Sequence, residues 1–122
     1  MRRTTLLRHD LPNGHTHADW LVQTSDRPEA PVLAFRLRTR VDRPGLVLFS
    51  AERLPDHRAF YLDHAGPVSG GRGTVTPIAR GVLLDFEDRG GRIKLRVDFG
   101  GGERRYRGVS ASGGMWIFEH ES

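Results

Sequence analysis

The chain has 122 residues and a net charge of +4, and its basic residues are eighteen arginines and a single lysine, Lys94. No apolar run approaches the length of a membrane-spanning helix, the N-terminus lacks the apolar segment of a secretory signal, and the absence of cysteine excludes disulfides and thiolate zinc sites. We therefore expect a cytoplasmic protein with no membrane partner, whose basic surface is compatible with nucleic-acid binding.

Short apolar segments separated by glycine- and proline-rich turns recur along the chain, as in β proteins. Segment 32–40 alternates apolar residues with arginines at 36, 38 and 40, and the continuous apolar run 46–50 is typical of a strand buried on both faces. Strands are predicted over 16–24, 32–40, 46–50, 58–64, 73–78, 81–88, 92–99, 104–110 and 115–120, with loops at 25–31 and 42–45. The pattern predicts one all-β domain over residues 1–122, either a sandwich or a barrel.

The core is expected to be aromatic, because aromatic residues at strand spacing usually serve packing. The predicted core residues are Trp20, Phe35, Phe49, Phe86, Phe99 and Trp116. His64 and His120 are expected to be surface residues.

Three histidines and two aspartates lie within residues 9–19 of a chain that has only six histidines. In a strand, His17 and Asp19 would point to the same face. The intervening turn is short enough to bring His9 beside His17. Two histidines and one carboxylate are a ligand set that suits Mn²⁺, Fe²⁺ or Zn²⁺. The alternative is a polar surface turn that binds no metal.

Two further segments contain residue types that can support catalysis. His57 follows Asp56 and precedes Tyr61 by four positions, and a histidine near a metal can act as a general acid or stabilise charge on a phosphoryl group. The alternative is a surface histidine with no such role. Residues 66–75 (GPVSGGRGTV) can form an anion-binding nest of backbone N–H groups around Arg72. We favour the other interpretation, a tight turn that needs positive φ angles.

These segments occur in an order that resembles a known family. The relevant residues are His9-Asp10, His17-Ala18-Asp19-Trp20, Asp56-His57, Tyr61, the turn 66–75 ending in Gly-Thr-Val, and Trp116-Ile117-Phe118. Over residues 6–119 the chain resembles the 3′-phosphoesterase domain of bacterial DNA ligase D and the stand-alone DNA polymerase ligase-like proteins.

The resemblance implies a compact β-barrel hydrolase that acts in DNA repair. It implies removal of a 3′-phosphate or 3′-ribonucleotide with Mn²⁺ or another divalent metal, held by His9, His17 and Asp19. His57 and Tyr61 match the catalytic pair that holds the phosphate. The candidate phosphate-binding residues are Arg53, Arg58 and Arg72. The implied partners are 3′ ends of DNA or of a DNA/RNA primer-template, and a separate DNA ligase or end-joining factor.

Two departures from the family pattern leave alternatives open. The turn before His17 is longer than in ligase D and contains His15, which has no assigned role. The arginine that follows the His-x-Asp-aromatic unit in ligase D is Leu21 here. The missing basic side chain motivates a second hypothesis, a non-catalytic nucleic-acid-binding barrel. A third is an Fe²⁺ oxygenase with a facial triad of His17, Asp19 and His57.

Overall fold

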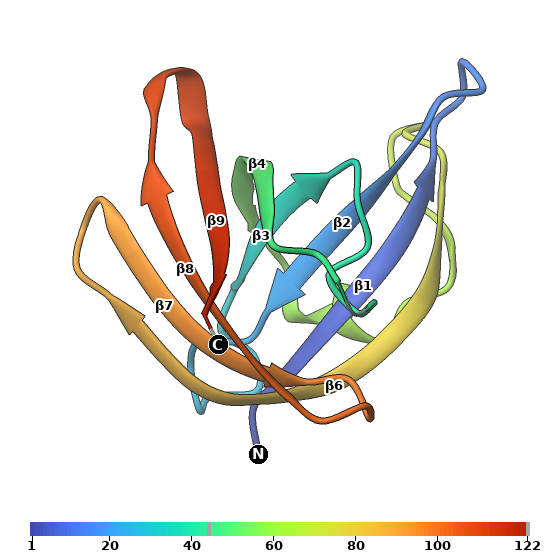
Figure 1. Ribbon diagram of the computed structural model, residues 1–122. Helices are drawn as coiled ribbons and strands as arrows, with labels where there is room; N and C mark the ends of the chain where they lie inside the picture. Colours follow the sequence, from blue (N-terminus) through green and yellow to red (C-terminus); the bar gives the residue numbers. More distant parts are fainter. Residues whose placement is uncertain (44, 122) are drawn as a thin grey trace.

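A computed structural model describes residues 1–43 and 45–121, and its strands close into an antiparallel barrel of eight strands in a single domain (Figure 1). The order around the ring is β1-β2-β3-β4-β9-β8-β7-β6, and β6 pairs back to β1. The strands are β1 (Arg3–Asp10), β2 (Thr16–Val22), β3 (Val32–Leu37), β4 (Leu48–His57), β6 (Thr74–Asp88), β7 (Arg92–Asp98), β8 (Glu103–Ser110) and β9 (Met115–Glu121). The short strand β5 (Gly66–Pro67) pairs with β6 outside the ring, and η1 (Ala59–Leu62) and η2 (Ser112–Gly114) are 3₁₀ turns. The predicted all-β barrel is confirmed.

Strand β6 closes the barrel because it pairs with two neighbours in succession. Its first part pairs with β1 up to Val82, and its second part pairs with β7 from Val82 onward. Pro77 lies at a bulge in the β1–β6 ladder, where a missing N–H group is tolerated. At Gly81 a Cβ atom would lie 2.4 Å from the carbonyl oxygen of Asp98, so only glycine fits where the strand changes partner. The separate strands predicted over 73–78 and 81–88 are therefore one strand.

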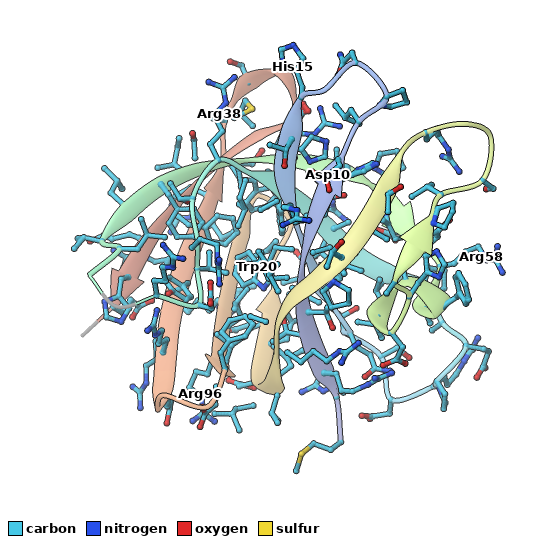
Figure 2. The ribbon with its side chains drawn as sticks, turned by 90° about the vertical axis from the view of Figure 1, so that its right-hand side faces the viewer. Asp10, His15, Trp20, Arg38, Arg58 and Arg96 are labelled. Carbon is cyan, nitrogen blue, oxygen red and sulfur yellow. The ribbon has the colours of Figure 1, made fainter. Side chains whose placement is uncertain are left out.

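The barrel interior is filled by aromatic and aliphatic side chains, as predicted. Trp20 lies near its centre (Figure 2), fully buried, with Tyr106 and Phe118 packed edge-on at ring-centroid distances of 6.0 and 5.7 Å. Of the predicted core, Trp20, Phe35, Phe49 and Trp116 are at most 5% exposed, whereas Phe86 and Phe99 are only partly buried against it.

A second apolar cluster lies on the outer face of β1, β2 and β3, because neighbouring residues of a strand point to opposite faces. Its members are Leu7, Leu21, Val32, Ala34, Leu62 and Val75. Leu62 comes from η1, and its carbonyl accepts a hydrogen bond from Thr5 Oγ1 at 3.1 Å. Nearby, Arg3 forms an ion pair with Asp63 at 2.6 Å. The outer cluster therefore holds the η1 segment against the outside of the barrel.

Several predictions of local structure are wrong. Segment 58–64 contains the η1 turn instead of a strand, because Leu62 must turn back toward the outer cluster. The run 46–50 is not buried on both faces, since Phe49 is 5% exposed but Leu48 is 64% exposed, and Val47, which precedes the strand, is 62% exposed. Strand β1 escaped prediction because its adjacent leucines, Leu6 and Leu7, are buried on opposite faces and give no alternation.

His64 and His120 are half-buried and not fully exposed. Residue 44, in the predicted loop 42–45, and residue 122, at the end of the predicted domain, lie outside the described residues. Within the described chain, no helix has the length and apolar character needed to cross a membrane.

Candidate metal centre

The β1–β2 ladder brings the three predicted metal ligands together. His9 and His17 are direct partners across the ladder, and Asp19 lies two residues after His17 on the same face. All three point outward, because the alternate residues Ala18 and Trp20 pack toward the barrel core. One ligand atom from each residue lies within 4.8 Å of the others, which is a spacing that can hold a metal ion.

The hydrogen bond of His9 fixes which of its ring nitrogens faces the cluster. Its Nε2 lies 2.8 Å from the backbone carbonyl oxygen of Arg72, and a carbonyl oxygen can only accept, so Nε2 carries the proton. In the neutral ring Nδ1 then has a free lone pair, 3.3 Å from Oδ2 of Asp19. In that form the two facing acceptors form an arrangement that can bind a cation. A backbone carbonyl that orients a ligand histidine in this way is typical of metal sites.

His17 and Asp19 contain polar atoms that have no hydrogen-bond partner. The side chains are only 10% and 3% exposed, and both ring nitrogens of His17 and Oδ1 of Asp19 are buried and unsatisfied. Nδ1 of His17 lies 2.9 Å from that Oδ1 atom without hydrogen-bond geometry. Burial lowers the pKa of His17, and the charge of Arg36 acts in the same direction against the opposing effect of Asp19. A neutral imidazole is the form that binds a metal.

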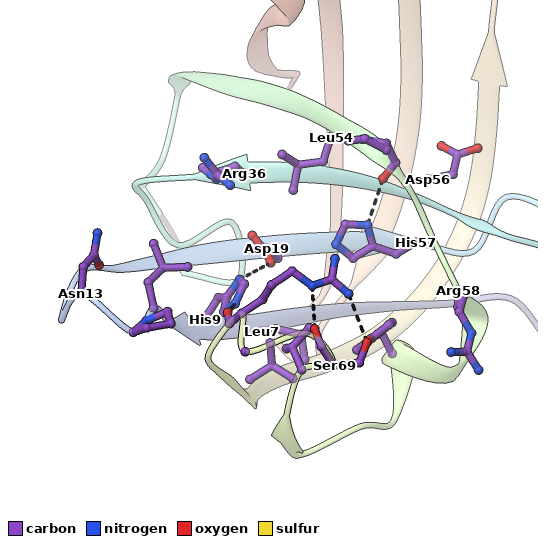
Figure 3. Close-up of a pocket in the computed structure, with 18 residues that line it drawn as sticks. Leu7, His9, Asn13, Asp19, Arg36, Leu54, Asp56, His57, Arg58 and Ser69 are labelled. Atoms are coloured by element: carbon purple, nitrogen blue, oxygen red, sulfur yellow. Dashed lines mark hydrogen bonds and ion pairs between the residues drawn. The ribbon is translucent and has the colours of Figure 1, made fainter.

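A cavity of about 840 Å³ opens beside this cluster, and Figure 3 shows the residues around it. His9 and Asp19 line it from the barrel side. His57, at the end of β4, and Tyr61, in η1, line it from the other side, and the rings of these two residues are 6.0 Å apart. Nδ1 of His57 lies 2.9 Å from the carbonyl oxygen of Pro55 and must donate to it, which leaves Nε2 as the free ring nitrogen. The structure thus brings His57 and Tyr61 to the same cavity as the cluster, although neither belongs to it.

The three predicted phosphate-binding arginines have different positions. Arg58 and Arg72 line the cavity. Arg72 donates hydrogen bonds to the backbone and side-chain oxygens of Ser69 at 2.7 and 3.2 Å. Arg53 is not among the residues that line the cavity, but its guanidinium lies 3.9 Å from Oδ1 of Asp56, which does line it. The assignment of Arg53 to this site stays a prediction.

Sequence reasoning missed Arg36 as a member of the site. Arg36 is the partner of Asp19 in the β2–β3 ladder, so its side chain points to the same outer face, and it lines the cavity. Its nearest carboxylate, on Glu52, is 3.7 Å away, and its side chain is 43% exposed. Leu21, at which the resemblance implied an arginine, is fully buried in the outer cluster. The alternation of 32–40 indicated that Arg36 points away from the core, but only the pairing with β2 brings it to Asp19.

No family model matches the sequence, and no curated protein matches it either. The resemblance to 3′-phosphoesterases therefore remains a prediction from the motifs. His15, the remaining histidine of the hairpin, is exposed and lies outside the cluster.

The glycine-rich turn 66–73 has the positive φ angles that the favoured interpretation requires, at Gly70, Gly71 and Gly73. At Gly73 an added Cβ would lie 2.0 Å from the carbonyl oxygen of Asp10, whereas at Gly70 its nearest neighbour is Nε of Arg72 at 3.7 Å. The turn is thus seated directly on β1, and it carries the Arg72 carbonyl that orients His9.

We expect Gly73→Ala to lower the free energy of unfolding by about 2 kcal/mol or more, because strain at positive φ adds to a backbone clash. Metal affinity should fall roughly tenfold as the Arg72 carbonyl moves away from His9. Gly70→Ala is the matched control and should cost only about 1 kcal/mol. Urea denaturation measures the loss of stability and Mn²⁺ titration measures the loss of affinity. Equal losses in the Gly73→Ala and Gly70→Ala variants would contradict the close contact of Gly73 with β1.

Proposed function

We propose that this protein is a metal-dependent phosphoesterase that removes a terminal phosphate or ribonucleotide from nucleic-acid 3′ ends. The main support is the convergence of unsatisfied buried atoms of His17 and Asp19 with the lone pair of His9, on the wall of a cavity that has basic residues. The motif order supports the choice of substrate. The Fe²⁺ oxygenase is less well supported, because its third ligand, His57, lies outside the cluster.

His9, His17 and Asp19 would hold the metal, and two imidazoles with one carboxylate suit Mn²⁺ among other divalent ions. A metal bound there polarises a phosphoryl oxygen and lowers the pKa of water. In the net reaction, water forms a new bond to phosphorus, the bond from phosphorus to the 3′ oxygen breaks, and that oxygen ends as a hydroxyl group.

The other cavity residues would bind and orient the phosphate. Protonated His57 can donate from Nε2 to a phosphoryl oxygen while Pro55 holds the opposite side of its ring. The Tyr61 hydroxyl group can donate a second hydrogen bond. Arg36 supplies positive charge from β3, next to Asp19, in place of the arginine that Leu21 replaces.

The direct test uses purified protein with Mn²⁺ and two oligonucleotides, one ending in a 3′-phosphate and one in a single ribonucleotide. We expect release of phosphate or of the ribonucleotide, no release with a chelator, and none with Asp19→Asn. If the wild-type protein leaves both ends intact over hours with every divalent metal tried, the catalytic proposal is wrong. The binding-module hypothesis instead predicts that a His17→Ala/Asp19→Ala double variant binds DNA as well as the wild type.

We expect Arg36→Ala to lower kcat/KM for release of the 3′-phosphate by about a hundredfold, the usual cost of losing one donor to a developing phosphoryl charge. Arg36→Lys should recover only part of this loss, because lysine lacks the planar two-pronged donor. Stabilisation by Mn²⁺ should remain. Arg92→Ala on β7, at the opposite side of the ring, removes the same charge and serves as the control. Equal kcat/KM values for Arg36→Ala and Arg92→Ala would contradict the role of Arg36.

A further inference from the structure

A second cavity, of about 690 Å³, adjoins the candidate metal centre. It is lined by the β1–β2 hairpin, by residues 36–40 and by Ile78, and His17 forms part of its wall. Leu11, Asn13 and Arg36 line both cavities. The metal ligands therefore lie between two hollows that meet at Arg36, and the second one has no role in the chemistry described above.

The second cavity is strongly basic. Four arginines line it, at positions 8, 36, 38 and 40, and none of its described lining residues is acidic. Arg8 forms an ion pair with Asp10 at 3.2 Å, and Arg40 donates two hydrogen bonds to Asp42 at 2.7 and 2.6 Å. Arg38 is exposed, and within residues 1–43 and 45–121 it forms no ion pair. Arg38 and the loosely paired Arg36 are thus the charges most available to a ligand.

Both arginines line the second cavity together with His17. Arg36 lies on β3, and Arg38 directly follows the end of that strand at Leu37, with both side chains exposed. Arg36 is the partner of Asp19 on β2, and Arg38 follows it in the direction away from the first cavity. Figure 2 shows Arg38 at the same end of the barrel as His15, which lines the same cavity. The charges therefore form a row that leads outward from the metal centre.

An unsatisfied hydroxyl group also indicates a ligand in this cavity. Oγ1 of Thr39 is buried and has no hydrogen-bond partner, and Thr39 is one of the lining residues. A buried polar atom without a partner is rare and requires an explanation such as a bound water, ion or ligand group. A hydroxyl group between arginines is a typical donor to a phosphate oxygen.

We propose that the second cavity binds the phosphodiester backbone of the single strand whose 3′ end occupies the first cavity. Arg36 binds the phosphate at the junction of the two cavities, and Arg38 and Thr39 bind the next phosphate toward the 5′ side. The inference rests on the proposed function for the chemical class of its ligand. It adds a direction for the strand across the barrel and a reason for activity to depend on strand length.

The test, in the absence of metal, compares two ligands that both end in a 3′-phosphate. One is a nucleoside 3′-phosphate, which has no second phosphate, and the other is a single strand of about twelve nucleotides, within the site size of a small barrel. Fluorescence anisotropy measures their Kd values over a range of salt concentrations. Arg38→Ala should weaken binding of the longer strand about tenfold, the value of a charged hydrogen-bond contact, and the loss for the nucleoside 3′-phosphate should be at least fivefold smaller. The salt dependence should fall by about 0.7 in log–log slope, because one phosphate contact is lost. Thr39→Val should weaken the longer strand in the same selective way.

Arg92→Ala is the matched control, since it removes the same charge on the opposite wall, and it should leave the length dependence intact. Equal losses in Arg38→Ala and Arg92→Ala would overturn the proposal, as would competition by poly-glutamate as strong as that by DNA. Hydrolysis of the 3′-phosphate, assayed with Mn²⁺ on the same wild-type protein, separates the two proposals. If the wild-type protein hydrolyses the 3′-phosphate but Arg38→Ala shows no selective loss of binding, only the strand-site proposal is wrong. If Arg38→Ala shows the selective loss but the wild-type protein hydrolyses nothing, only the catalytic proposal is wrong.

Discussion

Addition of Mn²⁺ should stabilise the wild-type protein and should leave His17→Ala unchanged. A ligand that binds only the folded state at a hundred times its Kd adds about 2.7 kcal/mol to the free energy of unfolding. His17 is one of three candidate ligands, and both of its ring nitrogens lack partners. Thermal denaturation with and without Mn²⁺ measures the gain. Hydrolysis of a 3′-phosphate by the variant should fall by more than about a hundredfold, beyond the usual effect of residues that only orient a ligand.

The stability of His17→Ala without metal shows whether His17 acts as a metal ligand or stabilises the fold. Because the histidine makes no hydrogen bond there, its loss should change the free energy of unfolding by only about 1 kcal/mol or less. His120→Ala, on β9, should keep the full gain from Mn²⁺ and serves as the control. A large loss of stability in the metal-free His17→Ala variant, with Mn²⁺ stabilisation retained, would mean that the cluster is part of the packing and does not bind a metal.

Trp20→Ala should cost about 4 kcal/mol, near the upper end for a buried aromatic side chain and a large share of the total stability of a domain this size. The indole ring is fully buried and lies 5.7 to 6.4 Å, between centroids, from Phe35, Phe49, Tyr106 and Phe118. Its Nε1 also donates a hydrogen bond to Oγ1 of Thr4 at 2.8 Å. Urea denaturation followed by circular dichroism measures the loss.

Two variants show whether this loss comes from the interior position. Trp20→Phe keeps much of the ring volume and should cost about 2 kcal/mol, from the smaller ring and the missing hydrogen bond. Ile117→Ala, on β9 with 39% exposure, should cost about 1 kcal/mol or less. A cost for Trp20→Ala no larger than that of Ile117→Ala would be incompatible with the aromatic interior. Trp20 also lies between Asp19 and Leu21, so this packing holds the strand that carries two of the metal ligands.

The alternation of side chains in the sequence was sufficient to predict the fold class and the relation of His17 to Asp19. A strand places residues two apart on one face, so the outward direction of this pair and the inward direction of Trp20 required no tertiary information. Where the local pattern does not alternate, prediction failed. Strand β1 carries two adjacent leucines that serve two different apolar clusters, and 58–64 turns because Leu62 packs against the outside of the barrel.

The rest of the candidate site depends on contacts between residues far apart in the chain. Strand register brings Arg36 to Asp19, and the seating of Gly73 on β1 brings the Arg72 carbonyl to His9. Arg58 and Arg72 line the cavity, whereas Arg53 lies beside one of its lining residues, Asp56. Side-chain periodicity is a local property of the chain and can be read from the order of residues. Which strands pair, and in which register, depends on how the barrel closes and on what its two apolar clusters bury, so only the tertiary structure decides which charges meet at the metal centre.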